Sequence, residues 1–262
     1  MKKDSLKREL FDIKQIIGSL DKKLAIILIS FPILQTISWY YSSRKFFGEH
    51  IYPIWFKGND FADLYEFLYW FLCDTILYLL FTSVLIKFII KEKISNFGFR
   101  IGDKKGFYYV ILFLMFMIPI LWIVSSVPEF SEKYPHLQLA KGDYKVFFIY
   151  EVGMLFYLLA WEFVFRGYLL FGLFKKFNYY AILIQMIPFV ILHNGKPVLE
   201  TFSAILGGII LGYLAIKTSS FFYGFLVHFG IMFIIDLLSV LRFRNDSYGI
   251  DINSFIKIIG LN

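Results

Sequence analysis

The sequence predicts an all-α polytopic membrane protein, a helical bundle of about seven to eight transmembrane helices. Two observations support this fold class. Of the 262 residues, 58% are hydrophobic and only 18% are charged, and that charged share is below the quarter usual for soluble domains. The apolar residues also gather in runs of about twenty, the length that an α-helix needs to cross a bilayer. A soluble domain could not bury this much apolar surface, so we expect a lipid bilayer around the chain.

Seven apolar segments are expected to be the spans, because each is long, nearly free of charge and bounded by polar or basic residues. In chain order they are 24–41, 64–90, 107–127, 144–174, 179–192, 198–216 and 221–241. The segments 42–63 and 128–143 are expected to be loops. An eighth span would require 64–90 to be split, and that segment is too short for two.

The charge distribution predicts the orientation of the protein. Residues 1–23 place apolar residues at helical spacing among lysines and arginines, which is typical of an amphipathic helix on a membrane surface. The segment 87–105 and Lys175–Lys176 are also basic. The positive-inside rule therefore predicts a multi-pass protein of the plasma (cytoplasmic) membrane with a cytoplasmic N terminus. The net charge of +7 is explained by these segments, so we expect no nucleic-acid partner.

The stretch Trp161-Glu162-Phe163-Val164-Phe165-Arg166-Gly167 is the most informative part of the sequence. It places a carboxylate and a guanidinium four residues apart in an apolar run, where a helix brings them onto one face. A charge in hydrocarbon must face protein or a wet cavity, so the Glu162/Arg166 pair is a candidate functional site. In the alternative interpretation, Arg166 reaches the interface from a helix end and Glu162 only neutralises it.

Further candidate residues follow in the C-terminal half, where His193 and His228 fall at the end of, or inside, apolar spans. A desolvated glutamate can act as a general base toward water. Neutral imidazoles can bind zinc or hydrogen-bond to a developing oxyanion. His193, His228 and Glu162 could thus hold a catalytic zinc ion, and a metal-free mechanism would use the same residues. The single cysteine, Cys73, excludes an intrachain disulfide and any multi-cysteine metal site.

Two carboxylates, Glu200 and Asp236, are possible auxiliary residues. Glu200 follows the His193 turn and could place a carboxylate near that histidine. It could instead be a first-turn residue that favours the helix macrodipole. Asp236 lies two turns after His228, and its alternative interpretations are an ion pair with Arg242 or a position near the membrane interface.

Together these residues resemble the CPBP family of intramembrane proteases. This family, also called the Abi family, contains the CAAX prenyl endopeptidases and bacterial proteins tied to bacteriocin self-immunity. Its pattern has three parts in order on separate helices, E-E-x-x-x-R, F-x-x-x-H and H-x-x-x-N. Glu162 and Arg166 match the first part, Phe189 and His193 the second, and His228 the histidine of the third. The resemblance implies a membrane-helical fold, usually drawn with eight helices, and intramembrane endopeptidase activity.

Two positions depart from this pattern. Trp161 replaces the first glutamate, which the family uses as catalytic base, and Met232 replaces the asparagine that donates to the oxyanion. Glu162 is turned about 100° around the helix from position 161 and cannot simply take over. Asp236 and Glu200 are the carboxylates that could substitute for the missing polar groups.

Three functions are compatible with these features. The first is an intramembrane endopeptidase that cleaves a membrane-embedded or lipid-linked peptide or protein, with Glu162, His193 and His228 around the attacked carbonyl and Arg166 holding Glu162. The second is a catalytically inactive membrane scaffold or bacteriocin-immunity protein that binds a peptide in the same cavity. The third is a proton-relay transporter, which would need an inverted repeat that the sequence does not have.

We adopt the endopeptidase as the working hypothesis. It divides the chain into an N-terminal amphipathic cytoplasmic segment (1–23), accessory transmembrane helices (24–143), a CPBP-like catalytic core (144–241) and a C-terminal tail (242–262).

Overall fold

The computed structural model describes residues 2–260, with side chains from residue 8 onward, and every regular element in this part of the chain is helical. Six helical stretches are long and apolar enough to cross a membrane, so the predicted fold class is confirmed. They are Lys22–Phe56, Ala62–Ile90, Lys105–Val124, Tyr144–Phe177, Val198–Thr218 and Phe222–Asn245. A shorter apolar helix, α10 (Tyr180–Ile191), corresponds to the remaining expected segment.

Several of these stretches change helical geometry along their length. The first contains α2 (Lys22–Ile37), η1 (Ser38–Ser42), α3 (Arg44–Phe46) and η2 (Phe47–Phe56). The second contains α4 (Ala62–Thr75), η3 (Ile76–Phe81), α5 (Thr82–Val84) and η4 (Leu85–Ile90). The fourth contains α8 (Tyr144–Glu162), the π-helix η7 (Phe163–Phe171) and α9 (Gly172–Phe177). The others are α6 (Lys105–Val124), α11 (Val198–Thr218) and α12 (Phe222–Asn245).

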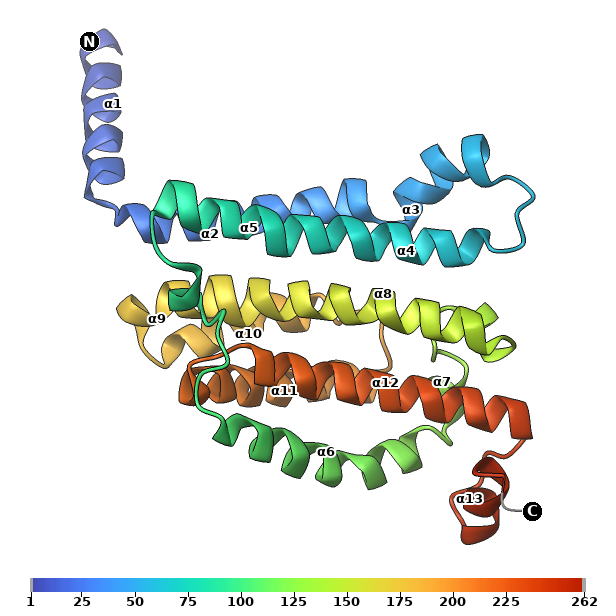
Figure 1. The fold of residues 1–262 in the computed structure, drawn as a ribbon. Coiled ribbons are helices and arrows are strands. Elements are labelled where there is room, and N and C mark those ends of the chain that lie inside the picture. The colour runs from blue at the N-terminus through green and yellow to red at the C-terminus, as the bar shows by residue number, and fades with distance from the viewer. Residues whose placement is uncertain (1, 261–262) are drawn as a thin grey trace.

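The remaining elements are short or lie outside the bundle. They are α1 (Lys2–Ser19), η5 (Ile94–Phe97), α7 (Pro128–Ser131), η6 (Gln138–Lys141) and α13 (Ile252–Ile258). Helix α1 runs across the direction of the spanning helices (Figure 1), as a helix lying on a membrane surface would. Its apolar residues Leu10, Ile13 and Ile17 are all exposed.

The expectation of a loop over 42–63 was wrong for most of its length, because the chain is helical up to Phe56. Ser43 interrupts the first helix with an extended backbone, at φ −69° and ψ 153°. Its hydroxyl accepts a hydrogen bond from the backbone N–H of Phe46 and so caps a new helix. The break is therefore one residue wide, and a loop remains only between Phe56 and Ala62.

Helix α8 and its continuation form the centre of the bundle (Figure 1). In the most apolar window of Tyr144–Phe177, 56% of the residues are buried, against 11% in the corresponding window of α6. Helices α10 and α11 pack closely where glycines face the neighbouring helix. A Cβ at Gly208 would lie 2.7 Å from Cγ of Met186, and one at Gly212 would lie 3.0 Å from Cγ2 of Ile182.

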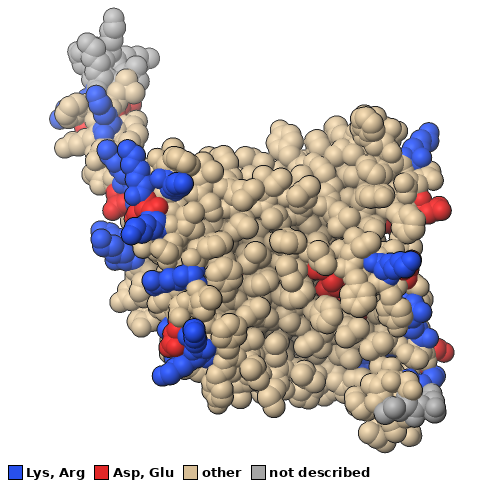
Figure 2. Space-filling model, viewed as in Figure 1, with Lys and Arg blue, Asp and Glu red and all other residues tan. Residues whose placement is uncertain are grey.

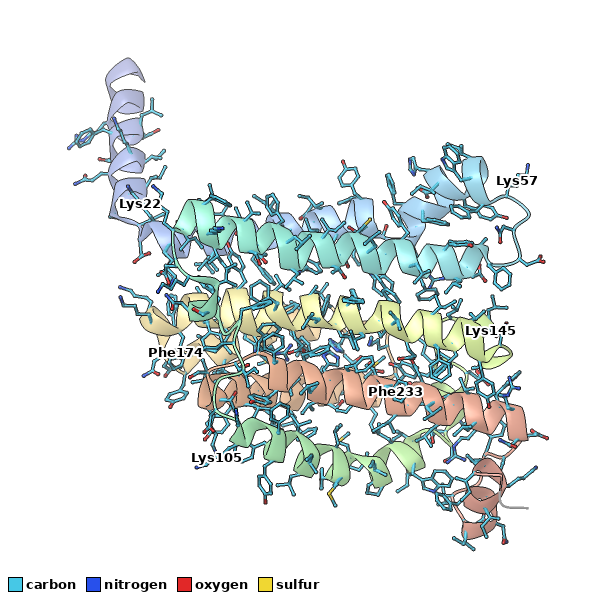
Figure 3. All side chains as sticks on the ribbon, in the orientation of Figure 1. Lys22, Lys57, Lys105, Lys145, Phe174 and Phe233 are labelled. Carbon is cyan, nitrogen blue, oxygen red and sulfur yellow. The ribbon has the colours of Figure 1, made fainter. Side chains whose placement is uncertain are left out.

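The surface has the charge pattern of a membrane protein. In the view of Figure 2, most charged side chains gather at the two ends of the molecule, with a broad uncharged band between them. Figure 3 shows Lys22 and Lys105 near one end and Lys57 and Lys145 near the other. Large apolar side chains such as Phe116 and Phe202 are exposed within the band. A bilayer around this band would cover them.

Candidate active site

The charged pair at the centre of the sequence motif lies inside the bundle. Glu162 ends α8 and Arg166 lies in the π-helical turn that follows, and neither side chain is exposed at all. Nη1 of Arg166 donates a hydrogen bond of 2.9 Å to Oε1 of Glu162. The guanidinium carbon lies 4.0 Å from the ring centroid of Phe189, which is cation–π contact. Arg166 is therefore held by protein and does not reach the interface.

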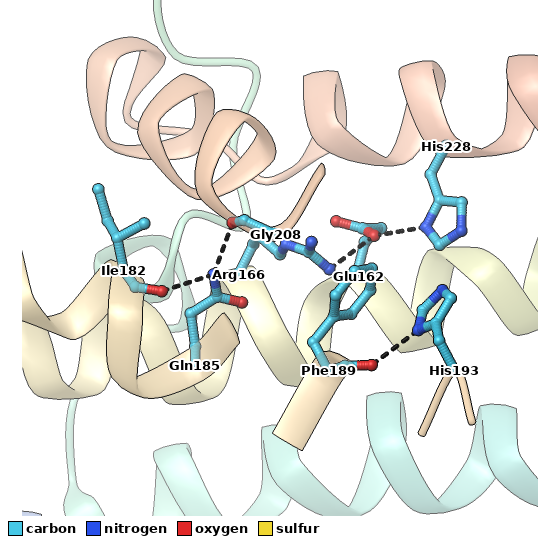
Figure 4. A network of polar contacts seen from close by, with 8 residues as sticks. All are labelled: Glu162, Arg166, Ile182, Gln185, Phe189, His193, Gly208 and His228. Atoms are coloured by element: carbon cyan, nitrogen blue, oxygen red, sulfur yellow. Dashed lines mark hydrogen bonds and ion pairs between the residues drawn. The ribbon is translucent and has the colours of Figure 1, made fainter. Parts of the chain in front are cut away.

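His228 on α12 joins this pair. Its Nδ1 lies 2.7 Å from Oε1 of Glu162 (Figure 4). An ionised carboxylate only accepts hydrogen bonds, so Nδ1 carries a proton and donates it. In the neutral imidazole Nε2 is then an unprotonated acceptor. The other carboxylate oxygen, Oε2 of Glu162, has no partner.

His193 follows the end of α10 and is held in the same way. Its Nδ1 lies 2.7 Å from the backbone carbonyl oxygen of Phe189, which also only accepts, so Nε2 is again the free acceptor. His193 lies in the turn after α10, outside the spanning helices. Burial, together with the nearby Lys196 cation, lowers the pKa of His193 to about 3, so the ring stays neutral at pH 7. Two imidazoles from different helices thus present free Nε2 atoms.

Both imidazoles line one cavity of about 500 Å³. The phenyl ring of Phe189 lies beside both, 4.4 Å from His193 and 6.1 Å from His228 between ring centroids. Three basic residues, Arg44, Lys45 and Lys196, line it where it is more exposed, together with Trp39. Arg44 and Lys45 belong to α3, which lies toward the end of the molecule opposite α1 (Figure 1), and Lys196 belongs to the turn between α10 and α11. The cavity therefore has a cationic rim and a buried interior.

The part of the chain that carries this arrangement also matches a known family. Residues 144–234 match the family model described as type II CAAX prenyl endopeptidase Rce1-like. This segment is Rce1-like. No curated protein and no solved structure matches the chain. The predicted resemblance to the CAAX proteases is confirmed, and with it the assignment of this segment to a family of membrane endopeptidases.

The two departures from the family pattern both face the cavity of the Rce1-like segment. Trp161 and Met232 line it, whereas Glu162, one residue along the helix from Trp161, does not. This agrees with the expected rotation of about 100° between neighbouring helical positions. The indole of Trp161 packs against Phe165 and Tyr157 at centroid distances of 4.9 Å and 5.7 Å. The cavity thus has aromatic and thioether groups where the pattern has a carboxylate and an amide.

Of the auxiliary carboxylates, Glu200 lies close to the His193 turn but is bound to other groups. It lies in the first turn of α11, where Lys196 donates to its Oε1 at 2.7 Å and the hydroxyl of Tyr134 donates to its Oε2. The structure records no hydrogen bond between Glu200 and His193 among the residues it describes. Glu200 thus neutralises Lys196 at the rim.

Asp236 is fully buried and does not line the cavity, and its carboxyl lies against the carboxyl of Glu151. The expected alternative, a pair with Arg242, does not form. The guanidinium of Arg242 instead donates to the Ser125 hydroxyl at 2.8 Å and to the carbonyls of Trp122 and Gly249, both also at 2.8 Å.

The fit of a metal ion can be judged from the donor atoms. Across residues 8–260, no group of three or more His, Cys, Asp or Glu side chains is placed to hold one. Oε1 of Glu162 is turned to Nδ1 of His228, and not toward the free Nε2 atoms. A catalytic zinc ion usually has three protein ligands, and here only His193 and His228 offer one each. Zinc remains a prediction from the sequence, and no step below depends on it.

Several cavity residues were not singled out from the sequence as site residues. Asp74, Trp70 and Tyr78 come from the second span, and Tyr157 lies one turn before Trp161. The one signal available for them was Asp74 itself, a lone carboxylate deep in an apolar segment.

Proposed function

We propose that this chain is an intramembrane endopeptidase that hydrolyses a peptide bond in a membrane-embedded or lipid-linked substrate. In this proposal it is a multi-pass protein of the plasma membrane with its N terminus in the cytoplasm. The observation that carries the proposal is the 2.7 Å contact between Nδ1 of His228 and Oε1 of Glu162. With Nδ1 donating to the carboxylate, Nε2 of the neutral ring is left as the acceptor, and His228 lines the cavity.

Hydrolysis follows from this arrangement in two steps. Nε2 of His228 takes a proton from a water molecule while the water oxygen bonds to the substrate carbonyl carbon. The imidazolium then returns that proton to the leaving nitrogen as the C–N bond breaks, giving an acid and an amine. Nε2 of His193 accepts the second hydrogen of the water and orients its lone pair.

Glu162 acts in this mechanism through His228 and not by touching the substrate. Its carboxylate fixes the tautomer and orientation of the ring and stabilises the imidazolium that forms, as the acid does in other acid–histidine pairs. Arg166 holds Glu162 from the other side at 2.9 Å. Glu162 and Arg166 are therefore positioning residues, and His193 and His228 are the catalytic ones.

The test is a cleavage assay of the full chain in proteoliposomes with a farnesylated CAAX peptide, the substrate class in the family description. We expect His193→Ala, His228→Ala and Glu162→Gln each to lower the rate by about 10²–10⁴-fold, the usual share of general acid–base catalysis. His50→Ala is the matched control, because His50 lies exposed in η2 and does not line the cavity.

A pH–rate profile distinguishes a Glu162 that positions the ring of His228 from a Glu162 that only stabilises the fold. Glu162→Gln should shift the pH at which the rate falls, because the imidazolium loses its carboxylate partner, whereas a structural defect would scale the whole curve. Wild-type rates in all three variants would sink the proposal.

Trp161 and Met232 favour a second candidate, a membrane protein that binds a peptide without cleaving it, as a scaffold or bacteriocin-immunity factor would. Both remove polar groups from the cavity wall while leaving its volume open. If the protein only binds a peptide, the wild type should bind it saturably without cleaving it, and Glu162→Gln should bind it equally well.

A further inference from the structure

The inner wall of the cavity, away from the histidines, contains a carboxylate with no assigned role. Asp74 on α4 lines the cavity and is 0% exposed. Its Oδ2 accepts a hydrogen bond of 2.8 Å from the indole nitrogen of Trp70. The hydroxyls of Ser38 and Ser42 also point to the carboxylate as neutral donors, although among the described residues Oδ1 has no partner in close hydrogen-bond geometry.

No basic side chain within the described residues forms an ion pair with Asp74. The basic residues of the cavity have other acids: Arg44 binds Glu66 at 2.6 Å, Lys45 binds Glu49 at 3.8 Å and Lys196 binds Glu200 at 2.7 Å. A buried carboxylate between spanning helices is costly unless a positive group compensates it. The protein alone leaves that requirement unmet at Asp74.

Aromatic rings surround the same part of the cavity. Tyr157 lies 5.0 Å from Trp70 and 5.7 Å from Trp161, and Trp161 lies 6.1 Å from Tyr78, measured between ring centroids. All four line the cavity together with Asp74. Aromatic faces next to a carboxylate favour organic cations through cation–π attraction. A divalent metal ion instead prefers several oxygen ligands.

We propose that Asp74, with Trp70, Tyr78, Tyr157 and Trp161, forms a subsite for a protic organic cation, the ammonium or guanidinium group of a ligand in the cavity. The donors around the carboxylate are all neutral, and a primary ammonium or a guanidinium supplies positively charged N–H groups to it. A quaternary ammonium, as in a choline headgroup, supplies none. The ligand is therefore a peptide with a lysine, an arginine or a free N terminus.

This subsite deepens the proposed function because it uses the same cavity, and it rests on that cavity receiving a peptide. Binding is measured without turnover. A protein that binds the cation but never cleaves keeps the subsite and loses only the hydrolysis. A protein that cleaves but ignores the cation loses only the subsite.

The experiment titrates the full chain in nanodiscs, following tryptophan fluorescence, because Trp70 and Trp161 line the subsite. The probes are n-butylammonium, ethylguanidinium, tetramethylammonium and the neutral n-pentanol. We expect saturable binding of the two protic cations, and binding at least tenfold weaker for tetramethylammonium and n-pentanol. This comparison needs no mutation, so it holds even where a variant fails to fold.

The variant Asp74→Asn keeps the size of the side chain and an acceptor for the Trp70 indole. It should weaken n-butylammonium at least tenfold. Asp236→Asn is the matched control, since Asp236 is an equally buried carboxylate that does not line the cavity, and it should bind like the wild type. Equal affinity for n-butylammonium and n-pentanol, or undiminished binding by Asp74→Asn, would overturn the inference.

Discussion

Glu162 and Asp74 are both fully buried carboxylates between spanning helices, and each contacts a residue four positions away on its own helix. For Glu162 that residue is Arg166, which supplies a full positive charge, and His228 adds a second donor. For Asp74 it is Trp70, which supplies only a neutral N–H. The same spacing thus gives one carboxylate a positively charged partner and leaves the other without one. The first is suited to holding a catalytic ring, and the second to receiving a ligand.

The largest effect is expected from removing the positive partner of Glu162. Arg166→Leu leaves a buried charge uncompensated and should destabilise the protein by about 3–5 kcal/mol. Reversible unfolding in detergent measures this, with Arg8→Leu on the exposed α1 as control. A loss below about 1 kcal/mol would mean that Glu162 is as uncompensated as Asp74, and the contrast between them would disappear.

A large gain in cleavage rate is expected from restoring the residues of the family pattern at positions 161 and 232. Trp161→Glu with Met232→Asn returns a carboxylate and an oxyanion donor to the cavity wall. A single oxyanion donor accounts for about 10²–10³-fold in rate in other hydrolases, so cleavage of the farnesylated peptide should rise by about that factor. A folded double variant with the wild-type rate would argue that the cavity holds no scissile bond.

A smaller loss is expected from crowding Glu162. A Cβ at Gly224 would lie 3.2 Å from the unpartnered Oε2, so Gly224→Ala should cost about 1–3 kcal/mol of unfolding free energy. Gly207→Ala is the control, because nothing lies within 4 Å of its added Cβ. It should gain up to about 1 kcal/mol through helix propensity. Equal behaviour of the two alanine variants contradicts this prediction.

The smallest effect is expected at Asp74 itself. Asp74→Asn keeps an acceptor for Trp70 and removes a charge that lacks a positive partner, so the unfolding free energy should change by less than about 1 kcal/mol. Glu162→Gln, measured in parallel, should lose more, because Arg166 then becomes the buried charge without a counter-ion. An equal loss of unfolding free energy in Asp74→Asn and Glu162→Gln would contradict this prediction.

The sequence was sufficient for the helices and for the local charged pair. Long apolar runs fix the spans, and the four-residue spacing of Glu162 and Arg166 fixes their contact. The helical part from 42 to 56 was missed because Pro53, Trp55, Gly58 and the mixed charges indicated a loop, while a single serine, Ser43, makes the actual break.

The cavity could be predicted only in part. The pattern of the family located His193, His228 and the exchanged positions Trp161 and Met232. Asp74 joins them across more than 80 residues of chain, through packing of α4 against α8, which no local spacing encodes. The role of Glu162 as a partner of Nδ1 of His228 likewise depends on how α8 and α12 are rotated against each other.

The position of the cavity rim has a consequence for where a substrate is met. Arg44 and Lys45 of the rim belong to α3, and Figure 1 shows α3 toward the end of the molecule opposite α1 and α9, the helix that carries the basic pair Lys175–Lys176. Under the orientation that the positive-inside rule favours, this end faces the outside of the cell. Exported precursors and toxins arriving from other cells could then enter without crossing the bilayer, whereas a protein lipidated in the cytosol would first have to be translocated.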